Sequence, residues 1–217
     1  MENKEAFRNL LLPHIRSIKP YEGVDPMEAM AERAGIPPDQ VIRLNGNENP
    51  YGPSPRVPEA LGAFPHYNHY PDPDQRRLRE RLSDYLNVAP EQIVAGNGSD
   101  ELIDLLLRMF VGPGDNIILP TPTFGMYAFT TEVCGGESIS VERDRDFEID
   151  LEGMKAAVNA HTKATFFASP NNPTGNIASD AVVRGLLETG ILVVVDETYY
   201  EFCGHTLLPL LDEYPNL

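Results

Sequence analysis

The sequence predicts an α/β fold, a doubly wound and mainly parallel sheet. Short apolar runs alternate with stretches of helical periodicity through the second half of the 217-residue chain. This alternation is typical of a parallel sheet covered on both faces, because the helices that connect the strands bury both of its sides. Ligands of such sheets bind at the carboxyl ends of the strands. The residues just after each apolar run are therefore where we expect the chemistry.

The composition argues against several kinds of partner and indicates where the protein is found. The chain carries 17 Lys and Arg against 33 Asp and Glu, a formal net charge of −16, and 41% of its residues are hydrophobic. Nucleic acids and anionic membranes attract clustered basic residues, so this balance argues against both as partners. No apolar run approaches the roughly 20 residues that span a bilayer. With no signal-peptide pattern and only two cysteines, the expected location is the cytoplasm.

The first third of the chain is predicted to be mostly loop. Residues 5–12 form a short apolar helix candidate, and residues 35–75 are dense in Pro, Gly and Asn, which indicates a long ordered loop with one helix near 56–63. A helix is predicted across 74–87, because four apolar residues there recur at i, i+4, i+7 and i+8: Leu78, Leu82, Tyr85 and Leu86.

Regular alternation begins after residue 90. Residues 92–95 are a strand candidate, and Ser99–Phe110 follows as a helix with Ser99 at its N-cap. Nearly every later position of that helix is apolar, so we expect it to be buried on most sides. Further strands are predicted at 116–119, 137–141, 164–169 and 191–196. The helices between them are predicted at 123–133, 151–159 and 178–189.

Four polar segments follow the predicted strands: 96–100, 120–125, 169–175 and 196–199. Each has an ordinary structural interpretation when it is taken alone. Gly-Asn-Gly-Ser before a helix is usually a tight turn and a cap, Asn-Asn-Pro-Thr-Gly is compatible with a β-turn, and an aspartate that ends a strand often caps a helix. Their order and spacing are what single them out.

Together these segments resemble the aminotransferases of fold type I that use pyridoxal phosphate (PLP). Asn-Pro-Thr-Gly at 172–175, followed by Asp-x-x-Tyr at 196–199, carries the resemblance. The segment 43–55, which contains Asn-Gly-Asn-Glu-Asn-Pro-Tyr-Gly, and the Tyr-Pro-Asp at 70–72 are similar to the histidinol-phosphate aminotransferase subgroup. The resemblance covers essentially the whole chain and implies PLP as cofactor, a small-molecule substrate and a homodimer.

The resemblance also implies roles for individual residues. Asp196 matches the anion beside the pyridine nitrogen of the cofactor, which must stay protonated for PLP to act as an electron sink. Asn172 and Tyr199 match donors to the phenolic oxygen, and Phe124 matches the ring that stacks on the pyridine. Asp196 and Tyr199 are thus the expected catalytic residues.

Phosphate and substrate contacts are implied in the same way. The turn that matches the phosphate cradle, with its backbone amides at a helix N-terminus, consists of Gly98, Ser99 and Asp100. Tyr70 matches a tyrosine that reaches the cofactor of the neighbouring subunit. Tyr21 and Asn47 resemble substrate-binding residues. No metal site is predicted.

One departure from the family concerns the Schiff-base lysine. In the family it lies in a Ser-x-Lys segment roughly thirty residues after the aspartate. Here 21 residues follow Asp196, and the four lysines, Lys4, Lys19, Lys155 and Lys163, all precede it. We therefore expect residues 1–45 to form an N-terminal arm and part of a small domain. Residues 46–217 should form an incomplete PLP-binding large domain that lacks this lysine segment and the C-terminal small domain, so the large domain looks truncated.

Three functions remain open from the sequence. The first is an aminotransferase acting on histidinol phosphate and 2-oxoglutarate in histidine biosynthesis, with a chain that is catalytically incomplete. The second is a related PLP-dependent decarboxylase of a phosphorylated amino acid, which would share the cofactor motifs. The third is a non-catalytic fragment or subunit of such an enzyme.

Overall fold

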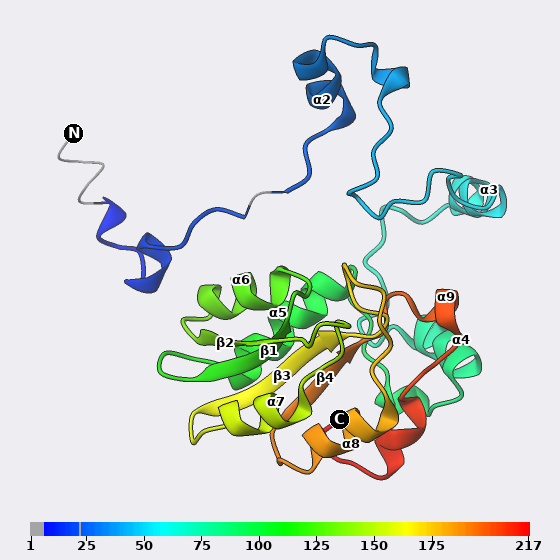
Figure 1. Ribbon diagram of the computed structural model, residues 1–217. Helices are drawn as coiled ribbons and strands as arrows, with labels where there is room; N and C mark the ends of the chain where they lie inside the picture. Colours follow the sequence, from blue (N-terminus) through cyan, green and yellow to red (C-terminus); the bar gives the residue numbers. More distant parts are fainter. Residues whose placement is uncertain (1–6, 22) are drawn as a thin grey trace. The chain divides into compact units, whose positions relative to one another are not determined.

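The computed structural model describes residues 7–21 and 23–217, and the chain divides into two compact units (Figure 1). One unit comprises residues 20–76. The other comprises residues 77–217 together with the N-terminal segment up to Lys19. The predicted division after residue 45 concerns the domains of a complete enzyme and stays a prediction.

The larger unit is built on a four-stranded parallel sheet. Its strands are β1 (Asn116–Thr121), β2 (Glu137–Glu142), β3 (Thr162–Ala168) and β4 (Leu192–Asp196). They lie in the order β2-β1-β3-β4, and every neighbouring pair is parallel. The four apolar runs after residue 115 therefore all form strands. All four carboxyl ends lie at one edge of the sheet, as the predicted fold requires.

Helices cover both faces of this sheet, which makes it doubly wound (Figure 1). On one face lie α5 (Ser99–Phe110) and α6 (Met126–Val133), and on the other lie α7 (Leu151–Ala157) and α8 (Asp180–Leu187). Each face has its own apolar core. The first core contains Ile103, Leu107, Ile117, Tyr127 and Phe166. The second contains Ile118, Met154, Phe167, Val183 and Leu186.

Shorter elements complete the larger unit: η1 (His14–Arg16), α4 (Arg76–Leu86), η3 (Pro90–Gln92), α9 (Tyr200–Cys203) and η4 (Leu208–Asp212). The N-terminal segment is tied to α6, because His14 Nε2 lies 3.1 Å from the carbonyl oxygen of Val133. The helix predicted over 5–12 begins outside the described residues, and it is not helical from residue 9 onward. None of the helices in the described part of the chain has the length and apolar character that a membrane crossing requires.

The smaller unit contains α2 (Met27–Ala34), η2 (Pro38–Gln40) and α3 (Arg56–Ala63). The predicted helix near 56–63 is confirmed, whereas α2 was not predicted. Local hydrogen bonds order the segment that follows η2. Asn49 accepts a hydrogen bond from the backbone N–H of Tyr51 (3.0 Å) and donates one to the carbonyl of Gly52 (3.1 Å), which closes a turn.

Two predictions about the start of the sheet are wrong. Residues 92–95 are not a strand, and Val94 is 73% exposed. A strand needs a neighbour for its backbone N–H and C=O groups, and among residues 7–21 and 23–217 no strand lies beside this segment. The N-cap of α5 is Gly98, not Ser99, which is the first helical residue and makes no side-chain cap.

The prediction that α5 is buried on most sides is also wrong. Ile103 and Leu107 are its buried residues, while large apolar side chains on its other faces remain exposed: Leu105, Met109 and Phe110. The four strands of the described chain give α5 only one surface to pack against. The apolar side chains turned away from the sheet therefore stay at the surface.

This asymmetry of α5 gives a paired stability test. Leu107 is 0% exposed and Leu105 is 45% exposed on the same helix. We expect Leu107→Ala to lower the free energy of unfolding by about 2–5 kcal/mol, since it leaves a cavity in the core. Leu105→Ala should change it by about 0.5 kcal/mol. Urea unfolding followed by circular dichroism measures both, and equal losses would contradict the described packing.

Candidate active site

Asp196 is the last residue of β4, at the carboxyl edge of the sheet. Hydrogen bonds fix both its backbone and its carboxylate. Its carbonyl accepts a hydrogen bond from the N–H of Ser169 (2.9 Å). One carboxylate oxygen, Oδ1, accepts from the N–H (3.0 Å) and the hydroxyl (2.5 Å) of Thr198. The other, Oδ2, accepts from the hydroxyl of Tyr127 (2.8 Å). A carboxylate has about four lone-pair sites, so these three bonds leave room for one more donor.

Tyr127 on α6 is fully buried, and its proton is firmly held. Burial raises the pKa of Tyr127 most, followed by the negative charge of Asp196, the hydrogen bond to it, and the charges of Asp100 and Tyr199. The hydroxyl therefore stays protonated and donates to Asp196. The hydrogen bond from Tyr127 to Asp196 joins α6 to the end of β4.

The segment after β3 is fixed by Asn171, which is 3% exposed. Its side-chain amide donates to the carbonyl of Pro122 (3.2 Å) and to the hydroxyl of Thr174 (2.8 Å), and its oxygen accepts from the hydroxyl of Thr123 (3.3 Å). These bonds join the loop after β1 to the loop after β3. Asn172, the residue predicted to donate to the cofactor, is half-buried beside this anchor.

The start of α5 offers a site for an anion. Gly98 has φ +80°, a conformation that favours glycine, and it turns the chain into the helix. The carboxylate of Glu101 accepts from the backbone N–H (2.5 Å) and the side chain (3.1 Å) of Asn97, which fixes the loop. The first N–H groups of a helix have no partner within it, so those of Ser99 and Asp100 are available to a phosphate.

Phe124 contributes an aromatic ring to the group of candidate residues at this edge. Phe124 follows β1, is half-buried, and meets Tyr127 edge to face, with 5.5 Å between the ring centroids. The group therefore combines a helix N-terminus for an anion, a ring for stacking, an amide and a phenol as donors, and a carboxylate for a cationic N–H. This donor set fits pyridoxal phosphate, whose phosphate, ring, phenolic oxygen and protonated nitrogen need these partners.

Three predicted residues lie in the smaller unit. Tyr21 is 52% exposed, Tyr70 is 100% exposed, and Asn47 has a positive φ of +50°. Their predicted substrate and cross-subunit roles stay predictions.

The lysines near the sheet lie away from Asp196. Lys163, at the start of β3, forms an ion pair with Asp115 (3.2 Å). Ala168 is the residue of β3 that pairs with Asp196, so Lys163 stands five residues, or roughly 16 Å, from that edge. Lys155 lies on α7, which packs on the opposite face from Tyr127. Neither lysine is placed to serve the site.

Sequence reasoning missed Tyr127 and Asn171. A signal for Tyr127 was present, because it follows Phe124 by three residues within the predicted helix 123–133, and that spacing would put both rings on one face. Asn171 stands beside Asn172 in the motif. Only the structure shows that the first asparagine is the buried anchor and that the second lies at the site.

Comparisons with known proteins show which family the sequence matches. The sequence pattern described as aminotransferase class I and II matches residues 39–217. Histidinol-phosphate aminotransferase of Roseiflexus castenholzii is 44% identical over 218 residues, which cover 98% of this chain and 59% of the relative. That of Dehalococcoides mccartyi strain BAV1 is 48% identical over 178 residues, 82% of this chain and 50% of the relative.

A solved structure gives the same result for the fold. Histidinol-phosphate aminotransferase from Sinorhizobium meliloti, in complex with pyridoxal-5'-phosphate, is 29% identical with a TM-score of 0.74, over 88% of this chain and 51% of that one. The chain thus spans between about half and three fifths of the length of these relatives. By sequence and by fold, it belongs to the class I and II aminotransferase family.

Proposed function

We propose that this chain provides the cofactor-holding half of a PLP-dependent histidinol-phosphate aminotransferase, which exchanges an amino group between histidinol phosphate and 2-oxoglutarate in histidine biosynthesis. The observation that carries the proposal is the carboxylate of Asp196, fixed by Tyr127 and Thr198 at the carboxyl edge of a parallel sheet. The names of the relatives support the choice of substrate.

Asp196 is the centre of the proposed chemistry. Pyridoxal phosphate, when bound, supplies an electron sink for the charge that develops as a substrate loses its α-proton. The remaining lone pair of Asp196 accepts the N–H of the pyridine ring and keeps that nitrogen protonated. Tyr127 donates to Asp196 and fixes the carboxylate without taking its negative charge, because its own proton is firmly held.

The remaining cofactor contacts divide among three elements. The N–H groups of Ser99 and Asp100 hold the phosphate, with the positive end of the α5 dipole behind them. Phe124 stacks on the ring and excludes water from one of its faces. Asn172 and Tyr199 donate to the phenolic oxygen and stabilise its negative charge.

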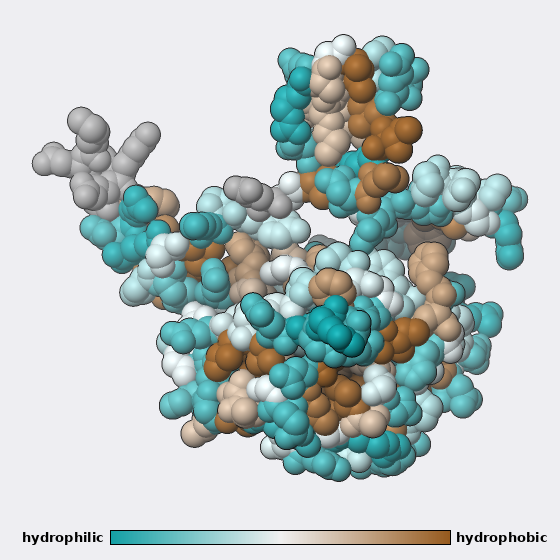
Figure 2. Space-filling model, in the orientation of Figure 1, coloured by the Kyte–Doolittle hydropathy of each residue, from teal (hydrophilic) through white to brown (hydrophobic). Residues whose placement is uncertain are grey.

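The rest of the proposal concerns the whole enzyme. In this proposal a lysine outside residues 1–217 supplies the amine that holds the cofactor and moves the substrate proton, since Lys155 and Lys163 lie away from Asp196. We propose a cytoplasmic homodimer in which Tyr70 reaches the cofactor of the second subunit, and Tyr21 and Asn47 contact substrate. Hydrophobic residues of the smaller unit reach its surface (Figure 2), and the exposure of Ile42 and Leu44 supports a subunit contact there.

A substitution at the first turn of α5 tests the phosphate site in the chain alone. Ser99 is the first helical residue, where proline is tolerated. Ser99→Pro removes one N–H donor, so PLP should bind about tenfold more weakly by fluorescence titration, since hydrogen bonds to charged groups contribute about 1.5–3 kcal/mol. Ser99→Ala keeps the N–H and is the matched control. Equal affinities for the two variants would argue against this cradle.

The role of Asp196 is tested in a chimera that joins residues 1–217 to the part of the Roseiflexus relative that follows its aligned segment. Asp196→Asn should retain PLP and lower kcat with histidinol phosphate at least about a thousandfold, because the developing charge loses its stabilisation. Tyr127→Phe should lower kcat about ten- to a hundredfold and shift its pH profile. Near-normal turnover of the asparagine variant would mean that Asp196 is misassigned.

The 217-residue polypeptide by itself should not transaminate. Lys155 and Lys163, the lysines near the sheet, are not placed to form the covalent link with the cofactor or to move the substrate proton. The check is an assay with histidinol phosphate and 2-oxoglutarate after complete removal of host aminotransferases. Repeated turnover would overturn the prediction, and Lys155→Arg and Lys163→Arg would then identify the amine.

A further inference from the structure

Two carboxylates stand next to each other at the carboxyl end of β4, and they face opposite ways. Asp196 accepts from Tyr127, which belongs to the apolar core on the α5 and α6 face of the sheet. Glu197, the next residue, accepts from the backbone of Leu207, which belongs to the core on the other face. Successive side chains of an extended segment point to opposite sides, so Glu197 is directed away from the face that Asp196 serves.

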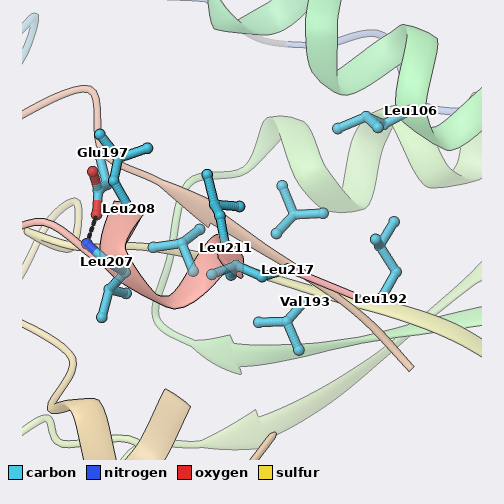
Figure 3. Close-up of a pocket in the computed structure, with 10 residues that line it drawn as sticks. Leu106, Leu192, Val193, Glu197, Leu207, Leu208, Leu211 and Leu217 are labelled. Atoms are coloured by element: carbon cyan, nitrogen blue, oxygen red, sulfur yellow. Dashed lines mark hydrogen bonds between the residues drawn. The ribbon is translucent and has the colours of Figure 1, made fainter. Parts of the chain in front are cut away.

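The carboxylate of Glu197 closes a loop of the chain. Its Oε1 accepts from the backbone N–H of Leu207 (2.7 Å), and Figure 3 shows this bond in the wall of an apolar pocket. Its Oε2 accepts from the hydroxyl of Thr206 (2.8 Å), and that hydroxyl accepts in turn from the N–H of Leu208 (3.2 Å). One partly buried side chain thus joins the end of β4 to residues nine and ten positions further along the chain.

Tyr199, the proposed donor to the phenolic oxygen of the cofactor, lies inside this loop. It precedes the short helix α9, and the N–H of Tyr200 donates to the carbonyl of Glu197 (2.9 Å), which closes the turn that contains Tyr199. After α9 the chain turns at Gly204, whose φ of +69° favours glycine, and it reaches Thr206 two residues later. The backbone and the side chain of Glu197 therefore hold the segment that carries Tyr199 from both ends.

Both ends of the loop are attached to fixed parts of the fold. At the near end Asp196 accepts from the N–H (3.0 Å) and the hydroxyl (2.5 Å) of Thr198. At the far end Leu207 and Leu210 are 3% and 4% exposed, and they pack in the core on the α7 and α8 face of the sheet. Packed cores resist small displacements, so the bond from Leu207 to Glu197 has a stable donor.

Two bonds reach this loop from other helices, and both join exposed groups. The hydroxyl of Tyr85 on α4 donates to Glu201 (2.9 Å), and Nε2 of His205 lies 3.1 Å from a carboxylate oxygen of Asp180. Interactions between exposed groups contribute little, because water competes for them. Hydrogen bonds to a carboxylate are roughly twice as strong as those between neutral groups, and those of Glu197 are partly buried. Its carboxylate should therefore be the strongest of these restraints.

We infer that Glu197 is a positioning residue for the proposed reaction: by closing the loop it fixes the direction in which Tyr199 donates to the phenolic oxygen of the cofactor. The inference rests on the proposed function, and it gives Glu197 no contact of its own with cofactor or substrate. A hydrogen bond weakens steeply when its donor angle departs from linearity, so a small shift of the loop weakens the bond from Tyr199. The two carboxylates at the end of β4 thus have separate tasks. Asp196 serves the ring nitrogen, and Glu197 serves the phenolic oxygen through Tyr199.

The first test measures the position of Tyr199 in residues 1–217 without cofactor. With 3-fluorotyrosine at position 199, the chain should give one narrow fluorine resonance, because the closed loop holds one conformation. Glu197→Ala should broaden or split it. Glu197→Gln should leave it single, since an amide can accept from Leu207 and donate to Thr206. Glu188→Ala, which removes an exposed carboxylate at the end of α8, is the matched control and should change nothing.

The second test follows the bound cofactor in the chimera with the Roseiflexus relative. The visible absorption of bound PLP changes with pH, and a donor to the phenolic oxygen favours its anionic form. Glu197→Ala and Tyr199→Phe should each raise the midpoint of this change by about one pH unit, the size expected for one lost hydrogen bond to a charged group. The double variant should match Tyr199→Phe alone, because the effect of Glu197 passes through Tyr199. Thr206→Val removes one of the two donors to the Glu197 carboxylate and should raise the midpoint by less.

The outcomes distinguish failure of the inference from failure of the proposed function. A single narrow resonance in Glu197→Ala, or a midpoint shift that adds to that of Tyr199→Phe, overturns the inference. If thermal unfolding shows that Glu197→Ala does not fold, Thr206→Val replaces it, and an unchanged resonance and midpoint in that variant overturn the inference. A disturbed resonance with a midpoint that Tyr199→Phe leaves unchanged supports Glu197 as the restraint on the loop and contradicts the proposed role of Tyr199. A chimera that binds no PLP contradicts the proposed function, and the fluorine resonance then decides on the loop.

Discussion

The bond between the buried Tyr127 and Asp196 is the constraint on which the site depends. It joins α6, on one face of the sheet, to the end of β4, and its donor is a tyrosine with no exposed surface. Phe124 packs against the same ring, so the stacking surface and the carboxylate share one support. A shift of α6 would therefore disturb two contacts at once, and the packed core below it, with Phe166, resists that shift.

The proposed site binds the negative charge of a phosphate through backbone dipoles, not through basic side chains. Residues after 110 include 5 basic and 16 acidic side chains, so the proposed phosphate contacts are the backbone amides of Ser99 and Asp100 at the positive end of a helix. Backbone amides carry no positive charge, so they do not form an ion pair with Asp196 in place of a cationic N–H. Separate partners can thus hold the anionic and the cationic ends of one small molecule.

The sequence predicted the parallel sheet well, because apolar runs that alternate with helices have few other solutions. It predicted the wrong state for 92–95, since strand propensity forms no strand without a neighbour. It also missed Asn171 and Tyr127, whose importance lies in burial and in partners 48 and 69 residues away along the chain. Pattern and spacing report local periodicity, whereas these contacts join segments that meet only in the folded chain.

The order of the strands affects how the sheet assembles while the chain is synthesised. β1, β2, β3 and β4 leave the ribosome in sequence, and each later strand adds to an edge that is already formed, which leaves β4 as the last edge of this part. Val194 and Val195 of β4 and the leucines beside them are only partly buried, so this edge is open to other nascent chains while the protein is made. Chaperones that bind extended apolar segments should recognise this edge and protect it from aggregation during synthesis.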